Sequence, residues 1–296
     1  MKNCYKFAVL ISLFSIPIFL YSQSENYNNL AISWQKGLAG GGAAYPHSAA
    51  SLWTNPSISP GKGFYSESHI SFLPAGIQVN NLSFSFKKKK KLSTGFAFNS
   101  ENFGNFDRRD IKGNLTGKFD GSQVQFLINT AFQFSNRLSI GYNFRQASLT
   151  IDDKKYGASA HQSALTLSDR SAKTRFSISS IKWNNETLPV YKISLSRELQ
   201  YLPIIFCFDH DIKNKFDIKN SIISAYILPG EDLHFYAGLT LQHFSMQTQS
   251  MVQDFISGLG VGAAWHYKTI DLHMAFYHYG GLGLSSSMGI SWALTS

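Results

Sequence analysis

Apolar and polar residues alternate along most of this chain with the period of a β-strand. In Leu138–Arg145, Leu, Ile, Tyr and Phe occupy one set of alternate positions, while Ser, Gly, Asn and Arg occupy the other. Leu92–Phe98 and Phe235–Gln242 repeat this pattern. A period of two residues indicates strands with one apolar and one polar face. Because no helical stripe of useful length competes with these segments, we predict an all-β chain.

The alternating segments predict about fourteen strands. Their ranges are 64–72, 77–86, 92–99, 124–134, 137–150, 161–169, 174–183, 190–198, 203–211, 220–228, 233–243, 256–267, 269–277 and 284–294. Every second connector is short, and the longest of the others are expected at 100–123, 151–160, 212–219 and 244–255. An even number of antiparallel strands with short turns at one end is typical of a transmembrane β-barrel. A large soluble β-sandwich is the alternative.

The composition suits a transmembrane barrel, although by itself it does not decide against the sandwich. Only 15% of the 296 residues are charged, whereas soluble proteins average about 25%. The mean hydropathy of −0.12 argues against a helical membrane protein, so a membrane would be crossed by strands. Aromatic residues near the strand ends are candidates for the girdles that ring such barrels. They are Trp183, Tyr201, Trp265, Tyr267, Tyr277, Tyr279 and Trp292.

The N-terminus has the order of a secretory signal peptide. Lys2 and Lys6 supply positive charge, Phe7–Tyr21 is mostly apolar, and the small residue Ser22 precedes Gln23. The apolar run is too short for a spanning helix, which needs roughly 20 residues. We therefore expect a signal peptide over 1–22, an N-terminal segment over 23–63 and a barrel over 64–296. A Gram-negative outer membrane is the expected location.

The formal net charge of +9 is concentrated rather than spread along one face. Much of the excess lies in Lys87–Lys91, between two predicted strands. Nucleic-acid binders place aromatic residues among their basic ones, and here the aromatic residues follow the strand period instead. We predict no nucleic-acid partner, and we expect this lysine run at the periplasmic rim of the barrel.

Small residues dominate the segment before the first strand. Gly40, Gly41 and Gly42 lie in it, and the residues at 50–56 end in Trp53, Thr54, Asn55 and Pro56. Glycine-rich loops cradle phosphate when they join a strand to a helix, but no Gly-Lys-Ser/Thr follows here. Small residues and an Asn-Pro turn suit a compact plug inside a barrel instead. We therefore predict a lumenal hatch with Trp53, Asn55, Pro56 and the three glycines as its candidate residues.

These residues also carry a resemblance to a known family. The Ala-Ser-Leu-Trp-Thr-Asn-Pro run at 50–56 resembles the N-terminal signature of PorV/PorQ-like proteins, which belong with FadL-type outer-membrane barrels. The likeness continues through segments of the middle and the C-terminal region, namely 188–195, 199–203, 255–262, 270–272 and 277–283. Pro46, His47 and Ser48 stand where the family often has an acidic pair, so ligand contacts of those acids are not carried over.

The resemblance implies a fourteen-stranded barrel with an N-terminal hatch and leaves two functions open. PorV/PorQ-like proteins serve type IX protein secretion, which implies secretion-system proteins as partners beside outer-membrane lipid. FadL-type relatives pass long-chain fatty acids or other hydrophobic compounds, which implies a hydrophobic ligand. Our first hypothesis is a non-enzymatic secretion component, with the hydrophobe channel as its alternative. A secreted β-sandwich adhesin is a third possibility.

The sequence gives little support for a catalytic site or a metal-binding site. Asp271 and His273 have the same strand phase and are expected to point into the lumen as a polar pair. They lack a third ligand of known position, so we predict no metal and no other cofactor. The Gly-x-Ser-x-Gly elbow is missing, and the alternating glycines of Gly258–Gly262 are read as close packing in the barrel wall. His210, between two aspartates at a strand end, is expected to be solvated.

Overall fold

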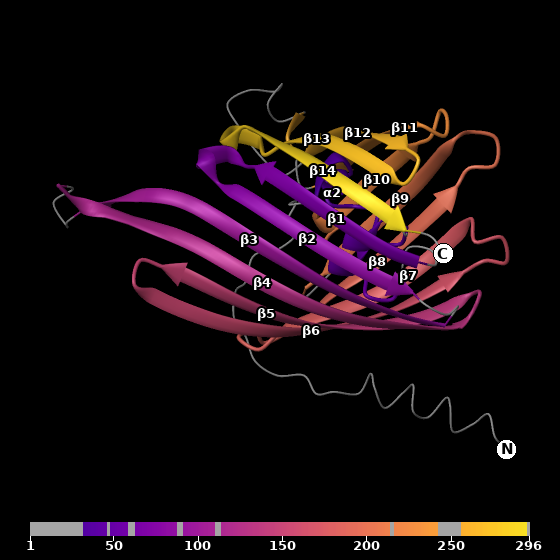
Figure 1. Ribbon diagram of the computed structural model, residues 1–296, viewed down its shortest axis with the longest axis horizontal. Helices are drawn as coiled ribbons and strands as arrows, with labels where there is room; N and C mark the ends of the chain where they lie inside the picture. Colours follow the sequence, from indigo (N-terminus) through magenta and orange to yellow (C-terminus); the bar gives the residue numbers. More distant parts are fainter. Residues whose placement is uncertain are drawn as a thin grey trace, which may run out of the picture.

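The computed structural model forms one closed antiparallel barrel of fourteen strands (Figure 1). It describes residues 32–45, 48–58, 63–87, 91–109, 114–213, 216–241 and 256–294. Each strand pairs with its neighbours in the chain, and β1 pairs with β14 from Phe64↔Leu294 to Phe72↔Ser286 to close the ring. The predicted all-β fold and its strand number are thus confirmed. The predicted signal peptide over 1–22 lies outside the described residues.

The strands follow the predicted ranges closely except at one side of the barrel. They are β1 (Gly63–Phe72), β2 (Gln78–Lys87), β3 (Leu92–Arg109), β4 (Leu115–Ser135), β5 (Leu138–Ile151), β6 (Lys154–Ser168), β7 (Thr174–Trp183), β8 (Val190–Glu198), β9 (Ile204–Ile212), β10 (Ser221–Ile227), β11 (Leu233–Thr240), β12 (Leu259–Tyr267), β13 (Ile270–His278) and β14 (Leu284–Leu294). Helical elements are short: α2 (Ser33–Gly37), η1 (Ala49–Trp53), η2 (Pro74–Gly76), η3 (Ile218–Asn220) and η5 (Gly280–Leu282).

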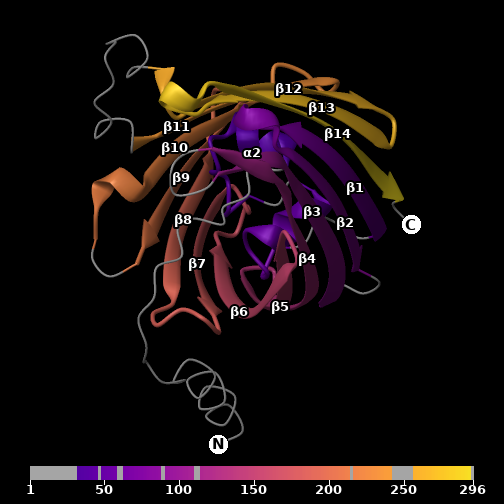
Figure 2. The same ribbon diagram turned by 90° about the vertical axis from the view of Figure 1, so that its left-hand side faces the viewer.

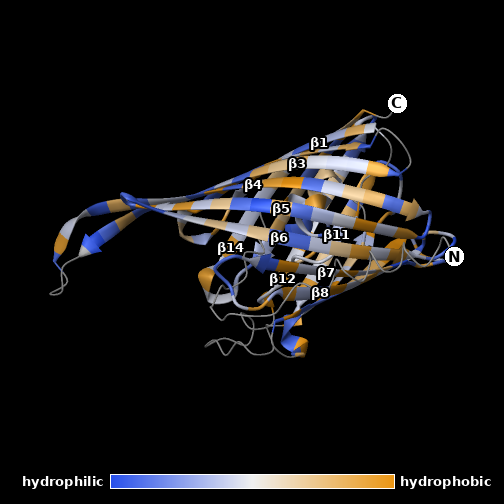
Figure 3. Ribbon diagram, turned by 90° about the horizontal axis from the view of Figure 1, so that it is seen from below, coloured by the Kyte–Doolittle hydropathy of each residue, from blue (hydrophilic) through white to orange (hydrophobic). Residues whose placement is uncertain are grey.

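The barrel has a polar interior and an apolar exterior, the reverse of a soluble protein. On β4, Gln125 and Asn129 are buried inside, while Phe126 and Ile128 are exposed outside. The two kinds of residue alternate along the strands, as the bands in Figure 3 show. An apolar outer face is stable in lipid, where the closed ladder leaves no backbone group unpaired. Within the described residues, no helix is long and apolar enough to span a bilayer.

The girdle prediction is right in orientation for some aromatic residues and wrong for others. Tyr201, Trp265, Tyr267 and Trp292 are exposed. Trp183 and Tyr277 are buried, and Tyr279 packs edge-on against Tyr277 with ring centroids 4.6 Å apart. Strand phase explains the error: the lipid-facing positions of β7 and β13 are even-numbered, so residues 183 and 277 face the lumen.

The predicted loops at 100–123 and 151–160 are largely strand. β3 continues to Arg109, β4 begins at Leu115, and β6 begins at Lys154. β3 loses its β2 partner after Asn102, and β6 has no β7 partner before Ala160. The extra lengths therefore form an open sheet beyond the rim, clearly visible in Figure 1. We call this sheet the wing, comprising residues 103–109, 115–122, 147–151 and 154–159.

Two apolar residues of β4 provide a test of where the lipid lies. Ile128 in the barrel and Leu115 in the wing are both 58% exposed. We expect Ile128→Arg to lower the free energy of unfolding from phospholipid vesicles by about 2–4 kcal/mol, because it places a charge in hydrocarbon. Leu115→Arg should change it little. Urea unfolding followed by tryptophan fluorescence measures both, and equal effects would contradict the assignment.

Candidate functional site

Residues 32–45 and 48–58 of the N-terminal segment lie inside the barrel and cross the lumen (Figure 2). We call these residues the hatch. Helix α2 packs against the wall formed by β11, β12, β13 and β14, and η1 lies against β1, β2 and β3. Trp34 and Leu38 are fully buried in a cluster with Tyr226 and Tyr236 of the wall. The hatch is therefore part of the barrel's core.

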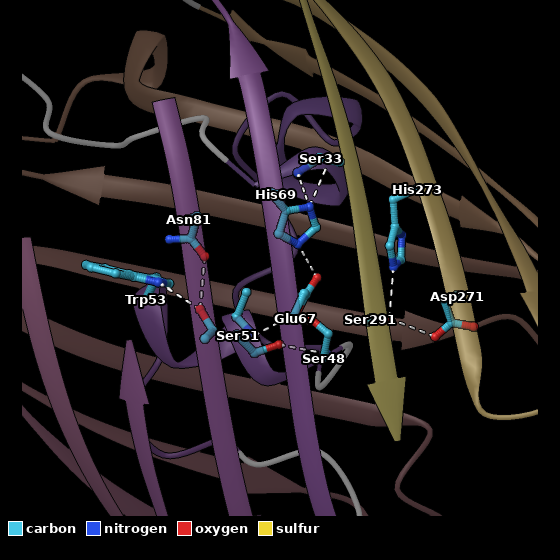
Figure 4. Close-up of polar contacts among 12 residues, drawn as sticks. Ser33, Ser48, Ser51, Trp53, Glu67, His69, Asn81, Asp271, His273 and Ser291 are labelled. Carbon is cyan, nitrogen blue, oxygen red and sulfur yellow. Dashed lines mark hydrogen bonds and ion pairs between the residues drawn. The ribbon is translucent and has the colours of Figure 1, made fainter. Parts of the chain in front are cut away.

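Helix α2 is joined to β1 through a buried histidine. The backbone N–H of Ser33 donates to Nδ1 of His69 at 3.2 Å, and Ser33 Oγ lies 2.9 Å from the same nitrogen. Because Nδ1 accepts, the ring proton is on Nε2, which donates to Glu67 Oε1 (Figure 4). Ser33, His69 and Glu67 resemble a hydrolase triad in order, but Ser33 is 0% exposed and leaves no room for a substrate carbonyl.

Glu67 joins the two halves of the hatch. Its Oε1 accepts from His69, which holds α2, and its Oε2 accepts from the backbone N–H of Ala50 in η1 at 2.9 Å. Glu67 is 1% exposed. A buried carboxylate is stable when hydrogen-bond donors surround it, so this one side chain fixes both helical pieces to β1.

The glycine-rich loop holds a carboxylate of the wall. The backbone N–H groups of Gly42 and Ala43 donate to the two oxygens of Asp209 at 2.7 and 3.2 Å. Gly40 and Gly42 have φ angles of 91° and 85°, which favour glycine. A Cβ at Gly41 would lie 2.6 Å from Ser224 Oγ. The loop thus forms an anion-binding concavity of the kind made by successive backbone amides, with a side chain of β9 as its anion.

Asn55 is the most densely bonded side chain of the hatch. Its Nδ2 donates to Ser177 Oγ at 2.7 Å and to the Ala43 carbonyl at 3.0 Å, and Thr166 Oγ1 lies 3.3 Å away. Its Oδ1 accepts from the backbone N–H and the hydroxyl of Ser57 at 3.1 and 2.7 Å. Asn55 therefore ties the glycine loop, the end of the hatch, β6 and β7 together.

Side-chain amides of the wall satisfy carbonyl groups at the end of η1 and beyond it. Asn143 of β5 donates to the Leu52 carbonyl at 2.7 Å, and Asn129 of β4 donates to the Pro56 carbonyl at 3.0 Å. Asn129 also donates to Asn143 Oδ1 at 2.7 Å. Carbonyls at a helix end have no partner within the helix, so the wall supplies the donors that water would otherwise provide.

Two further wall residues complete this set. Arg145 of β5 donates to the Trp53 carbonyl, and Gln162 of β6 donates to the Thr54 carbonyl at 2.9 Å. The Arg145 guanidinium also lies 5.4 Å from the ring centroid of Trp53. Trp53 Nε1 donates to Ser83 Oγ at 3.1 Å on the other side (Figure 4). The indole thus bridges the strands on two sides of the hatch.

Glycines of the wall let the hatch backbone come close. A Cβ at Gly141 would overlap the Pro56 carbonyl oxygen, and one at Gly260 would overlap the Lys36 carbonyl oxygen. Gly260 belongs to the Gly258–Gly262 run in which close packing was expected. Close backbone approach is a recurrent use of glycine within strands. Any larger residue at these two positions would displace the hatch.

Asp271 and His273 share the lumenal face and are linked indirectly. Ser291 Oγ lies 3.1 Å from His273 Nε2 and donates to Asp271 Oδ2 at 3.1 Å (Figure 4). His266 also bonds Asp271, and Tyr236 OH lies 3.2 Å from His273 Nδ1. Their neighbours in this chain satisfy both groups, and within the described residues no group of three His, Cys, Asp or Glu is placed to hold a metal ion.

The prediction of a solvated His210 is wrong. Its side chain is 1% exposed, its Nδ1 lies 2.8 Å from Ser221 Oγ, and its ring packs on Phe216 with centroids 4.1 Å apart. Asp209, expected beside it at the strand end, is also buried and binds the glycine loop. The ring that covers His210 belongs to Phe216. Phe216 lies in the connector at 212–219, and the strand pattern does not predict the path of a connector.

The described residues thus form a closed fourteen-stranded barrel with the hatch folded inside its lumen. No protein-family model matches this sequence, and no curated protein matches it either. Solved structures of the same fold are nevertheless similar over almost the whole chain.

Three of them are described as a hydrocarbon channel, a toluene transporter and a FadL homologue. The CymD monoaromatic hydrocarbon channel is 11% identical with a TM-score of 0.61, covering 90% of this chain and 99% of its own. The Pseudomonas putida toluene transporter TodX is 10% identical with a TM-score of 0.59, covering 92% and 98%. A Pseudomonas aeruginosa FadL homologue is 5% identical with a TM-score of 0.58, covering 94% and 100%. The chain thus has the fold of FadL-type barrels; the PorV/PorQ-like assignment stays a prediction.

Replacing Asn55 tests the hatch's hydrogen bonds. Asn55→Ala leaves the buried hydroxyls of Ser57 and Ser177 without their amide partner, and each such loss is worth about 1–3 kcal/mol. We expect the barrel to fold but the hatch to become more sensitive to proteolysis and the barrel more permeable to small solutes in liposome swelling. Asn105→Ala, an exposed residue of β3, is the control. Unchanged permeability in the folded Asn55 variant would count against the anchoring role.

Lys36 makes hatch docking depend on pH. Its Nζ donates to the Ser286 carbonyl at 3.2 Å, and burial lowers the pKa of this hatch residue to about 7. In water the pKa of a lysine is about 10.4. Between pH 10.4 and 7 the undocked side chain is protonated and the docked one is not, so the free energy of docking becomes less favourable by at most about 1.4 kcal/mol for each unit that the pH falls. Below pH 7 both forms are protonated, and this free energy no longer changes with pH. We expect hydrogen exchange of the hatch, corrected for intrinsic rates, to slow between pH 7 and 9.5. Lys36→Met should abolish this trend.

Proposed function

We propose that this protein is an outer-membrane channel for small hydrophobic compounds, with the hatch controlling passage through the lumen. The observation that carries the proposal is the polarity of the wing. In the barrel the outer face is apolar, whereas in the wing the outer face is polar and the inner face carries aromatic and aliphatic residues, with Arg108 and Lys154 toward its tip. Such a surface beyond the rim offers apolar molecules a place to bind before they enter.

The register defines the inner face of the wing. Phe106 pairs with Phe119 and Leu149 pairs with Tyr156, both in the phase that faces the lumen lower down. The rings of Phe106 and Phe119 stack with centroids 5.3 Å apart. Phe106 and Tyr156 are nonetheless 42% and 52% exposed. Exposed apolar clusters of this kind mark binding surfaces in proteins.

The outer face of the same sheet carries polar residues. Asn105 pairs with Asp120, and Asp107 pairs with Lys118, and all four are exposed. These side chains belong in water, because charged groups in hydrocarbon cost several kcal/mol. The wing therefore stands clear of the membrane, and its aromatic inner face is open to solutes.

A strip of lumenal positions leads from the wing to the hatch. Along β5, Ile151, Leu149 and Ala147 face the same side as Arg145, and Arg145 contacts Trp53 of the hatch. Ala147 also packs with Trp183 at the rim. A ligand bound to the wing thus has an apolar route of a few residues to the hatch. Trp53 is the hatch residue that such a ligand meets there.

The similar structures support a channel over the secretion role. CymD and TodX are described as a hydrocarbon channel and a toluene transporter, and none of the three structures reported above is described as a part of protein secretion. The hypothesis of a type IX secretion component, first in our sequence analysis, therefore gives way to its alternative. The channel reading also needs no catalytic group.

Uptake of a hydrocarbon tests the proposal. We expect cells that carry the protein in their outer membrane to take up toluene several-fold faster than cells without it at low concentration. Phe106→Ser with Tyr156→Ser should remove most of this difference, because the entry surface loses its aromatic groups. The control is Asn105→Ser with Lys155→Ser, on the outer face of the same strands. Absence of any protein-dependent uptake would overturn the proposed function.

A further inference from the structure

A pocket of about 180 Å³ lies at the turn end of the lumen, opposite the wing. Ser57 and Ile58 of the hatch form part of its lining. Three cationic side chains, Lys87, Lys91 and Arg175, come from β2, the turn before β3 and β7. The other lining residues are mostly small or hydrogen-bonding: Ser93, Ala131, Phe132, Gln133, Asn136, Ser139, Thr166, Ser168 and Ala172. No Asp or Glu is among them.

The positive charge of this pocket is not cancelled by ion pairs. Lys87 Nζ donates to the neutral Gln133 Oε1 at 3.1 Å, and the Arg175 guanidinium lies 5.4 Å from the ring centroid of Tyr45. Within the part of the chain that the structure describes, none of the three cations is within 4 Å of a carboxylate oxygen.

Two carboxylates, Asp169 and Glu198, act on the charge of Arg175 from a distance, and both have other partners. Asp169 accepts from Ser171 Oγ at 3.0 Å and from the Lys173 backbone N–H at 2.9 Å, and Glu198 pairs with Lys173 Nζ at 3.4 Å. The pocket therefore keeps a net positive potential that an anion would neutralise.

We propose that this turn-end pocket binds a phosphate group. Arginine presents paired N–H donors that match phosphate oxygens, and lysine adds a compact charge. Serine, threonine and amide groups of the lining supply further donors. A carboxylate carries one charge, whereas a phosphate carries between one and two near neutral pH, which matches a site with three cations more closely. The group would come from a free phosphate compound or from the head group of a phospholipid at the rim.

The site is separate from the hydrocarbon route but touches the hatch. The wing is at the other end of the barrel, and the hatch lies between them. Ser57 Oγ lies 2.6 Å from Thr166 Oγ1 and bonds Asn55, and both Ser57 and Thr166 line the pocket. A bound phosphate would therefore lie beside the anchor that fixes the end of the hatch. Hydrocarbon uptake is not required for phosphate to bind.

Titration of the purified full-length protein in an uncharged detergent tests this site. The probes are inorganic phosphate, followed by ³¹P NMR, and short-chain phosphatidic acid, followed by calorimetry. We expect binding of at least one probe, with a dissociation constant at least ten-fold higher in Lys87→Gln with Arg175→Gln. The control, Arg197→Gln with Lys268→Gln, removes one arginine and one lysine that are exposed at the same end but do not line the pocket. It should change the constant less than two-fold.

Each outcome has a definite meaning. Binding of inorganic phosphate supports the site and a soluble source, and binding of phosphatidic acid alone supports it with a lipid source. Binding of neither probe overturns the proposal. Equal losses in the pocket and control variants also overturn it, because they would show attraction by the overall charge of the rim. The heat-dependent gel mobility of each variant shows whether the barrel has folded. If the Lys87→Gln, Arg175→Gln variant does not fold, the variant Lys87→Arg with Arg175→Lys, which keeps both charges, is tested in its place.

Discussion

The structure depends on hydrogen bonding between the hatch backbone and the side chains of the lumen wall. A barrel with an apolar outer face has a largely polar interior, so beyond the apolar cluster around Trp34 and Leu38 the hatch must be held by polar contacts. The hatch contributes free carbonyl and N–H groups, which would be costly to bury without partners. Asn129, Asn143, Arg145 and Gln162 donate to its carbonyls, and Asp209 accepts from its amides. The polar interior is thus a docking surface shaped for one segment.

The strand pattern allowed the barrel to be predicted because alternation is a local property. Each strand can be recognised from the alternation within its own sequence, and the fourteen alternating segments were enough to predict the number of strands and their antiparallel order. The wing escaped prediction for a physical reason. A bulge between Asn102 and Gly104 shifts the register, and beyond it the outer face becomes polar. The glycines and charged residues of the wing suit a sheet in water. They do not fit the pattern of a membrane-spanning strand, so the sequence analysis predicted a loop there.

The hatch was predicted as a segment but its contacts were not. Asn55 and Thr166 are 111 residues apart in the chain, and no local pattern pairs them. Asparagine and glutamine are also the ordinary lining of a barrel, so composition does not single out Asn143 or Gln162. The acceptor role of Asp209 could have been sought, since a buried acid on a lumenal face needs donors. For Trp183 the strand phase alone would have predicted a side chain inside the lumen. It was assigned to the girdle because tryptophan is common there, and that assignment was wrong.

Helix α2 lies across the joint where the ring closes. The first and last strands meet at β1 and β14, whose paired residues are more than 200 positions apart in the chain. α2 holds β1 through Ser33 and His69, and it holds β14 through Lys36 and the Ser286 carbonyl. The helix therefore links the first and last strands from inside the lumen. Because α2 bonds to both strands of the seam, closure of the ring and docking of the hatch stabilise each other.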